Sequence, residues 1–318
     1  MLRKITLLLL FCFSVHLLAA QRVGLVLSGG GAKGLYHIGI IKALEENGIP
    51  IDYVAGTSMG AIISGMYAAG YSPQEMEQAF STPEVSYWLS GTMEPRYSFY
   101  YNQLPPRPAM ISADINFGTL KKAFTPKGKE KEEAPSGNSL IPSVKGFGPQ
   151  QLVPTDQLDM GLLSYFAGAN ALCGGDFDSL FVPFRCVSSD AIAKKPYVWD
   201  KGDLALAIRA SMAIPIVFSP VMVDSTAMYD GGVYNNFPWA EMKEIFDPDV
   251  IIGGRCVSGA IPDISTTTGQ IETLVMQPTD YNMPEELGIV VGRNIGVSVL
   301  DFSKPGLTIE QGYRDAME

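Results

Sequence analysis

The chain has 318 residues, 47% of them hydrophobic, and a formal net charge of −10. The acidic balance argues against nucleic acid as a partner and against electrostatic docking to anionic lipid, because both carry negative charge. The hydrophobic content is ample for a large buried core, and any contact with a lipid surface has to be apolar.

Residues 1–20 have the pattern of a secretory signal peptide. Two basic residues near the start precede an apolar run over residues 5–18, and small residues then lead to Gln21. We expect this segment to be removed and the protein to be exported, to the periplasm, the outer membrane or the medium. A single membrane anchor is the alternative, but the apolar run is shorter than the roughly 20 residues that a span requires.

Strand and helix patterns alternate at the start of the remaining chain, residues 21–318. A short apolar strand is predicted at 23–27, a helix over 35–47, a second strand at 51–55 and a second helix over 61–69. This order predicts an α/β fold with a parallel sheet and with helices on its faces.

One long irregular stretch interrupts the pattern. From about residue 90 to 154 the chain is rich in Tyr, Pro, Gly and Lys, and so long a segment is typical of a functional lid or of disorder. Before it, Ser72 and Pro73 mark the start of a helix. After it, we expect helices over 160–172, 203–212, 239–246 and 308–317, and strands over 180–187, 195–199 and 250–254.

Three cysteines follow the predicted signal peptide. These are Cys173, Cys186 and Cys256. Because their number is odd and they are widely spaced, we expect no disulfide framework. Cys186 and Cys256 have the apolar neighbours of small buried residues in strands.

A nucleophile elbow is indicated by Gly56-Thr57-Ser58-Met59-Gly60, between the second predicted strand and the second predicted helix. The turn is sharp, and glycine two residues either side of the serine avoids collisions between strand and helix. A chance pattern is the alternative in a chain with 33 glycines. The strand-to-helix context is nevertheless the one that the motif requires, and Ser58 is the candidate nucleophile.

A serine nucleophile needs a base. Of the two histidines, His16 lies in the predicted signal peptide and none follows Ser58, which excludes the usual order of serine, acid and histidine. His37 remains an alternative base, although a helix-surface or capping position is the expected role of a lone histidine. Asp230, followed by two glycines, is the best carboxylate base, with an ordinary Asp-Gly turn as the alternative.

A glycine-rich loop follows the first predicted strand. The backbone N–H groups of Gly29, Gly30 and Gly31 lead into a helix and suit a negatively charged oxygen. The spacing to Gly34 also matches a dinucleotide fingerprint, but that site needs an acidic residue at the end of the second strand, where the serine elbow lies. A Walker-type phosphate-binding loop is excluded, because Lys33 is followed by glycine rather than by Ser or Thr.

In this order, the glycine loop, the serine elbow and Asp230-Gly231-Gly232 resemble the three-part signature of patatin-like phospholipases, in particular exported bacterial members, and residues 210–215 resemble a further family stretch. The resemblance implies a three-layer α/β/α sandwich with a mainly parallel central sheet. It also implies a Ser58–Asp230 dyad, an acyl-enzyme intermediate, and no metal or cofactor. The glycine loop, Gly29 to Gly31, would form the oxyanion hole. Supporting positions would be Lys33, Gly34, Gly56, Gly60, Gly231 and Gly232.

The implied activity is hydrolysis of lipid acyl esters, of the phospholipase A or lysophospholipase type. Residues 21–318 would then form one patatin-like hydrolase domain, with an insertion or lid at about 90–154 and a C-terminal extension at about 260–318. The expected partner is a lipid or phospholipid substrate, met in peripheral contact with a membrane. Lys33 departs from the arginine of many members, which keeps the charge but loses the fork geometry. A catalytically silent secreted lipid-binding module and a general serine esterase are the alternatives.

Overall fold

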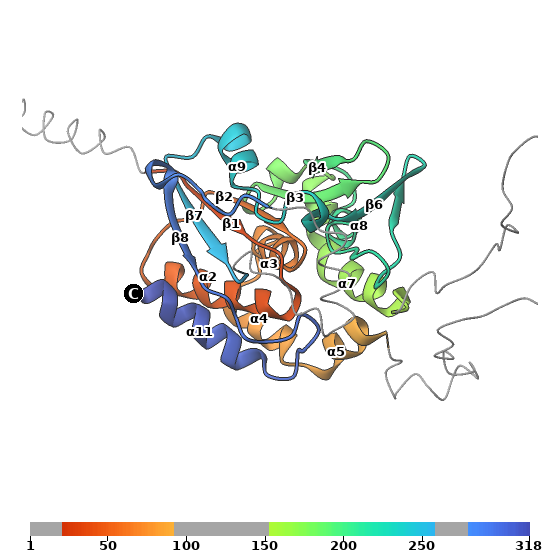
Figure 1. Ribbon diagram of the computed structural model, residues 1–318, viewed down its shortest axis with the longest axis horizontal. Coiled ribbons are helices and arrows are strands. Elements are labelled where there is room, and N and C mark those ends of the chain that lie inside the picture. Colours follow the sequence, from red (N-terminus) through yellow and green to blue (C-terminus); the bar gives the residue numbers. More distant parts are fainter. Residues whose placement is uncertain (1–20, 92–152, 258–278) are drawn as a thin grey trace, which may run out of the picture.

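The computed structural model describes residues 21–91, 153–257 and 279–318 (Figure 1). The predicted signal peptide and nearly all of the predicted insertion at 90–154 lie outside these described residues. In the three described ranges, no helix combines the length and the apolar character needed to cross a bilayer.

Eight strands in the described ranges form one sheet, in the order β5-β6-β3-β2-β1-β7-β8, with β4 also paired to β3. The strands from β3 through β2, β1 and β7 to β8 are parallel, whereas β4 and the β5–β6 hairpin are antiparallel to their neighbours. The predicted mainly parallel sheet is confirmed. The strands are β1 (Val23–Leu27), β2 (Tyr53–Thr57), β3 (Phe184–Asp190), β4 (Lys195–Trp199), β5 (Val221–Val223), β6 (Thr226–Asp230), β7 (Val250–Arg255) and β8 (Gly288–Gly292).

Helices cover both faces of this sheet (Figure 1). Successive strand side chains point to opposite faces, so Leu25 and Leu27 enter the larger core beside α2 and α3, while Val26 packs with Met242 of α9. Burial on both faces explains why the strands are continuous apolar runs. The helices are α2 (Tyr36–Glu46), α3 (Met59–Ala68), α4 (Pro73–Phe80), α5 (Pro83–Ser90), α7 (Asp156–Cys173), α8 (Leu204–Ser211), α9 (Trp239–Phe246), α11 (Pro305–Met317) and the 3-10 helices η1 (Gly31–Leu35), η3 (Phe177–Ser179), η4 (Gly231–Val233) and η5 (Glu285–Leu287).

The predicted elements agree with the observed ones to within a few residues at most positions. β4 and α9 have the predicted bounds, and Ser72 and Glu75 form the capping box of α4. The strand predicted at 180–187 begins only at Phe184. Helix α5 and strand β8 were not predicted, because each is short and carries little periodic signal of its own. The three described cysteines are buried and free.

The described part of the predicted C-terminal extension belongs to the same layers. Strand β8 pairs with β7 at one edge of the sheet, and α11 lies along α2 (Figure 1). Glycine makes this close approach possible, because a Cβ on Gly312 would lie 1.9 Å from the carbonyl oxygen of Tyr36. The Tyr36 hydroxyl also donates to Asp315 at 2.7 Å, and Arg293 donates to the same carboxylate. The described part of the extension, residues 279–318, therefore packs on α2 and on the edge of the sheet.

We expect Gly312→Ala to lower the free energy of unfolding by about 1–3 kcal/mol, because the added methyl group collides with backbone and forces α11 away from α2. Gly306→Ala is the matched control on the same helix, since no atom lies within 4 Å of a Cβ at that position. Urea unfolding followed by circular dichroism measures both. Equal effects of the two substitutions would contradict the close α2–α11 contact.

Candidate active site

Ser58 lies at the turn between β2 and α3 with a backbone conformation of φ 55° and ψ −121°. Residues with side chains rarely adopt such a conformation, and it is maintained only where the surrounding structure enforces it. Gly56 and Gly60 allow the turn, because a Cβ on Gly56 would lie 2.4 Å from Gly60 and one on Gly60 would lie 2.2 Å from the carbonyl oxygen of Leu27. The strand-to-helix context that a nucleophile elbow requires is present.

The backbone of Ser58 is held by Ser211, the fully buried last residue of α8. The Ser58 N–H donates to Ser211 Oγ at 3.0 Å, and this hydroxyl donates to the carbonyl oxygen of Val187 on β3 at 2.5 Å. The sequence assigned no role to Ser211, although it lies in the stretch 210–215 that resembles the family. Ser211 is therefore a positioning residue for the elbow.

Asp230 ends β6 and is only 1% exposed. Strand β3 lies between β2 and β6, and its Ser188 pairs with Asp230. After Asp230 the chain passes close to both strands, because a Cβ on Gly231 would lie 2.2 Å from the carbonyl oxygen of Val187 on β3 and 2.8 Å from Cγ2 of Thr57 on β2. Gly231 directly follows Asp230, and Thr57 directly precedes Ser58. The contact between Gly231 and Thr57 therefore places Asp230 and Ser58 near each other. The fold brings together the two residues predicted to form the dyad.

Hydrogen bonds hold both the carboxylate and the backbone of Asp230. Its Oδ1 accepts the N–H of Gly232 at 2.7 Å, and the Asp230 N–H donates to the carbonyl oxygen of Ala213 at 2.8 Å. Gly232 is also close to Asn236, whose Oδ1 would lie 2.9 Å from a Cβ at Gly232. An ordinary Asp-Gly turn, the alternative interpretation, explains the hydrogen bond from Gly232 to the carboxylate. It does not explain why Asp230 is buried.

The glycine loop lies against the elbow. A Cβ on Gly29 would lie 3.0 Å from Cβ of Ser58. The Gly29 N–H donates to the carbonyl oxygen of Asn236 at 3.2 Å, whereas the N–H groups of Gly30 and Gly31 make no hydrogen bond to other residues of the described ranges. The donor of Gly29 therefore holds the loop on Asn236.

The two supporting residues of this loop lie in η1. Lys33 is half-buried, and its N–H donates to the carbonyl oxygen of Gly30 at 3.2 Å. Gly34 lets η1 pack on the start of α3, because a Cβ there would lie 2.5 Å from Cγ of Met59. Gly34 thus allows the loop to pack on the helix that follows Ser58, and the Lys33 N–H closes a turn within the loop.

Two further side chains hold the glycine loop and were not predicted. Asn236 Nδ2 donates to the carbonyl oxygen of Gly29 at 3.4 Å and to the hydroxyl of Tyr281 at 2.8 Å. Cys256 Sγ donates to the same Gly29 oxygen at 3.4 Å and would lie 2.6 Å from a Cβ at Gly30. Burial raises the pKa of the Cys256 thiol to about 11, so it stays protonated. In the sequence, only the closeness of Asn236 to the Asp-Gly-Gly motif could have indicated its role. Nothing in the sequence indicated that Cys256 contacts the glycine loop.

His37 is fully buried, so the expected helix-surface or capping position is wrong. The reason is tertiary: the ring lies on the side of α2 that packs on the sheet, where Nδ1 would lie 2.9 Å from a Cβ at Gly254 of β7, and the sequence of α2 alone does not reveal this. Nε2 of His37 donates to the carbonyl oxygen of Ser28 at 2.8 Å, and Nδ1 has no partner in the described ranges. Burial lowers the pKa of His37 to about 4, so the ring is neutral at pH 7.

This burial predicts an acid-dependent loss of stability. Between pH 6.5 and about 4, the unfolded chain binds a proton on His37 and the folded protein does not. The stabilisation is therefore complete above pH 6.5 and is lost as the pH falls towards 4, by about 3 kcal/mol at most. His37→Gln, which keeps an N–H donor for Ser28, should lose less stability over this interval. Urea unfolding at several pH values measures the difference, and parallel curves for the two proteins would contradict it.

The chain resembles a known protein family over the residues that carry the three motifs. A family model described as patatin-like phospholipase matches residues 25–243, which include all three motifs. The chain is 64% identical over 231 residues to lysophospholipase NTE1 of Yarrowia lipolytica, covering 72% of this chain and 12% of that protein. It is 28% identical over 228 residues to an uncharacterized NTE family protein of Mycobacterium tuberculosis, covering 71% of this chain and 47% of that protein. The chain thus spans less than half the length of these relatives.

Among solved structures, VipD from Legionella pneumophila has 18% sequence identity and a TM-score of 0.49, with 94% of this chain and 66% of that chain covered. The family model accounts for well over half of the chain, from β1 into α9. The observed layers are those of a patatin-like three-layer α/β/α sandwich. The chain therefore belongs to the patatin-like phospholipase family.

Proposed function

We propose that the protein is a lipid acyl hydrolase of the phospholipase A or lysophospholipase type. The observation that carries the proposal is the strained serine at the strand-to-helix turn, with a buried aspartate nearby and the glycine loop packed against it at Gly29. A nucleophile, a base and an oxyanion site are the three parts that acyl transfer requires.

In the proposed reaction, Ser58 Oγ attacks the ester carbonyl while Asp230 accepts the serine proton. The carbonyl oxygen becomes an oxyanion, and the N–H groups of Gly30 and Gly31 stabilise its negative charge. Collapse of this intermediate breaks the ester bond, and Asp230 returns the proton to the departing alcohol. Water then attacks the acyl-serine by the same route and releases the fatty acid.

Labelling with a fluorophosphonate tests the nucleophile. We expect one adduct by intact mass, located on Ser58 by peptide mass spectrometry. An adduct on another serine, or no adduct, would overturn the proposal. A panel of phospholipids, lysophospholipids and p-nitrophenyl esters, with products identified by mass spectrometry, then tests the substrate class. Labelling with ester turnover but without lipid turnover would favour a general serine esterase. Lipid binding without labelling or turnover would favour a silent lipid-binding module.

We further propose that the protein is an exported member of the bacterial type. The support is the pattern over residues 1–20, with basic residues, an apolar run and small residues before Gln21. Expression of the full sequence followed by mass analysis of the product should give a chain beginning close to Gln21. Recovery of the intact chain from the cytoplasm of an export-competent bacterial host would contradict this proposal.

A further inference from the structure

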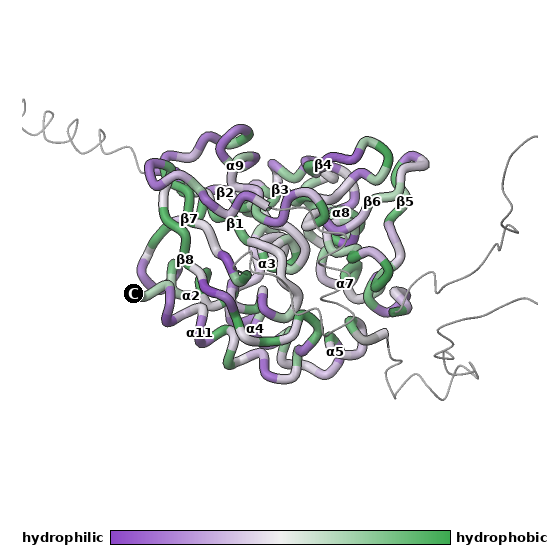
Figure 2. Tube along the Cα trace, in the orientation of Figure 1, coloured by the Kyte–Doolittle hydropathy of each residue, from purple (hydrophilic) through white to green (hydrophobic). Residues whose placement is uncertain are grey.

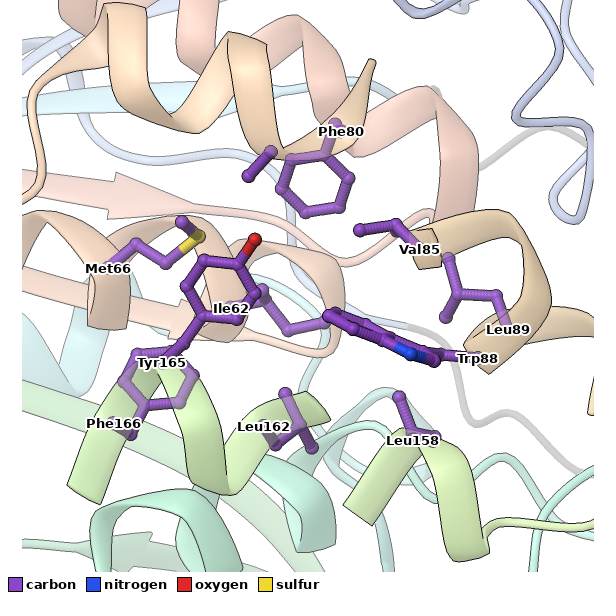
Figure 3. Close-up of a pocket in the computed structure, with 11 residues that line it drawn as sticks. Ile62, Met66, Phe80, Val85, Trp88, Leu89, Leu158, Leu162, Tyr165 and Phe166 are labelled. Carbon is purple, nitrogen blue, oxygen red and sulfur yellow. The ribbon is translucent and has the colours of Figure 1, made fainter. Parts of the chain in front are cut away.

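The two sides of the candidate site are held in place in different ways. Helix α3, which begins directly after Ser58, is held by apolar packing, since Ile62 and Met66 face side chains of α4, α5 and α7 around a small pocket in the hydrophobic core (Figure 3). Strand β7, which ends beside the glycine loop, also begins with a largely buried hydrophobic run (Figure 2). The loop itself, residues 29–31, consists of glycines and has no side chains to pack. Its position therefore depends on the groups that bond to it and fill the space beside it.

The side chain of Asn236 fills the space between the glycine loop and the turn that follows Asp230. Its Oδ1 would lie 2.2 Å from a Cβ at Gly29 and 2.9 Å from a Cβ at Gly232. A larger residue at either glycine would therefore displace the amide. Asn236 thus spaces the loop that serves the oxyanion from the turn that carries the proposed base.

Hydrogen bonds join Asn236 to the loop at two points. The Gly29 N–H donates to the backbone carbonyl oxygen of Asn236 at 3.2 Å, and Nδ2 of Asn236 donates to the carbonyl oxygen of Gly29 at 3.4 Å. The second partner sets the orientation of the amide, because a carbonyl oxygen only accepts and only the NH2 group donates. An ionised aspartate of the same shape would present an oxygen to Gly29 and repel the loop.

The C-terminal part of the chain holds this arrangement from behind. Nδ2 of Asn236 also donates to the hydroxyl of Tyr281 at 2.8 Å, and the Asn236 N–H donates to Oγ1 of Thr279 at 3.0 Å. At the other end of the loop, the N–H of Ala32 donates to the carbonyl oxygen of Val299 at 2.7 Å. Thr279, Tyr281 and Val299 all lie beyond the part of the chain that the family model matches. The site therefore uses contacts that the three motifs do not contain.

We propose that Asn236 is a positioning residue for the glycine loop and that Tyr281 acts through it. The inference rests on the proposed hydrolase function. In this role the amide holds the Gly29 peptide, and through it the N–H groups of Gly30 and Gly31, in place beside Ser58. Donors stabilise an oxyanion only when they are held at the right distance from it, and a misplacement of about 1 Å costs about 10²-fold in rate.

Asn236→Asp tests the amide. We expect kcat and kcat/KM for a p-nitrophenyl ester to fall together by about 10²-fold with KM unchanged, because the donors act in the transition state. Asn282→Asp is the matched control, since it adds the same charge at an exposed position one residue after Tyr281. It should leave both constants unchanged.

Titration with a fluorophosphonate separates positioning from unfolding. In Asn236→Asp, a displaced loop gives one adduct per chain at a rate lowered by about 10²-fold. A partly unfolded protein gives less than one adduct per chain, and its folded fraction reacts at the wild-type rate. Labelling at the wild-type rate, whether complete or not, would overturn the inference.

Tyr281→Phe covers the case in which Asn236→Asp fails to fold. The ring stacks on Phe237 with the centroids 6.0 Å apart, so the ring should stay in place while the acceptor for the Asn236 amide is lost. We expect kcat to fall about fivefold, which corresponds to one neutral hydrogen bond. Tyr313→Phe is the matched control, since it removes a hydroxyl that donates to Glu46 of α2. It should leave kcat unchanged.

A double substitution tests whether Tyr281 acts through Asn236. In the Asn236→Ala protein, Tyr281→Phe should lower kcat no further, because two residues that act through one contact are not additive. A further fivefold fall would show that Tyr281 acts elsewhere and would overturn the inference.

Failure of the inference can be told apart from failure of the proposed function. If the wild type hydrolyses esters but either Asn236→Asp or Tyr281→Phe keeps the wild-type kcat, the inference is overturned and the proposed function stands. If the wild type shows neither labelling of Ser58 nor hydrolysis of any ester, the proposed function fails and the inference fails with it.

Discussion

Ser58→Ala is expected to lower kcat for ester hydrolysis by about 10⁴–10⁶ and to abolish labelling by the fluorophosphonate. The substitution removes the only atom that forms the covalent bond to the acyl group, and the remaining oxyanion donors and binding contacts supply only a small residual rate. The fold should persist, because Ser58 acts structurally through its backbone N–H, which still donates to Ser211. Initial rates with a p-nitrophenyl ester and intact mass after labelling measure the two effects.

Ser64→Ala is the matched control for this substitution. Ser64 is a buried serine of the same helix, and its hydroxyl donates only to backbone carbonyl oxygens of its own helix, at Gly60 and Ala61. We expect it to lower stability by about 1 kcal/mol and to leave kcat and labelling unchanged. Hydrolysis by Ser58→Ala at the wild-type rate would refute the serine mechanism.

Asp230→Asn is expected to lower kcat by about 10²–10⁴, because the amide does not accept the serine proton. The substitution preserves the shape of the side chain, and its carbonyl oxygen still accepts the N–H of Gly232. Labelling of Ser58 should therefore become slower rather than disappear, which separates loss of the base from loss of the nucleophile. Steady-state kinetics and the time course of labelling measure these effects.

Asp224→Asn makes the same chemical change in the exposed turn between β5 and β6. We expect it to leave both rates unchanged. If Asp230→Asn retains full activity, the dyad is wrong although Ser58 could still be the nucleophile. His37 would then be a poor substitute as the base, because its unprotonated nitrogen, Nδ1, lies against Gly254 of β7, 2.9 Å from the position of a Cβ there, on the other side of β1 from β2 and Ser58.

Local patterns in the sequence were sufficient to predict the alternating order of strands and helices and the nucleophile elbow. The apolar run at β1 indicated a strand buried on both faces, the run at β2 indicated a second strand, and the capping residues of α4 fixed the start of that helix. Ser58 could be singled out because the constraint on a strand-to-helix turn is local: glycine must stand two residues away on each side. Asp230 was harder to assign, since an aspartate before glycine is also common in ordinary turns.

The sequence by itself determined the order of the elements, the elbow at Ser58 and the family, because each depends on neighbours within a few residues of chain. Only the tertiary structure placed Gly231 against Thr57, assigned the donor of Gly29 to Asn236, buried His37 against Ser28 and Gly254 and enclosed an apolar pocket along α3. These features join residues far apart in the chain, and the register of the strands and the packing of the helices, rather than local pattern, decide which of them meet.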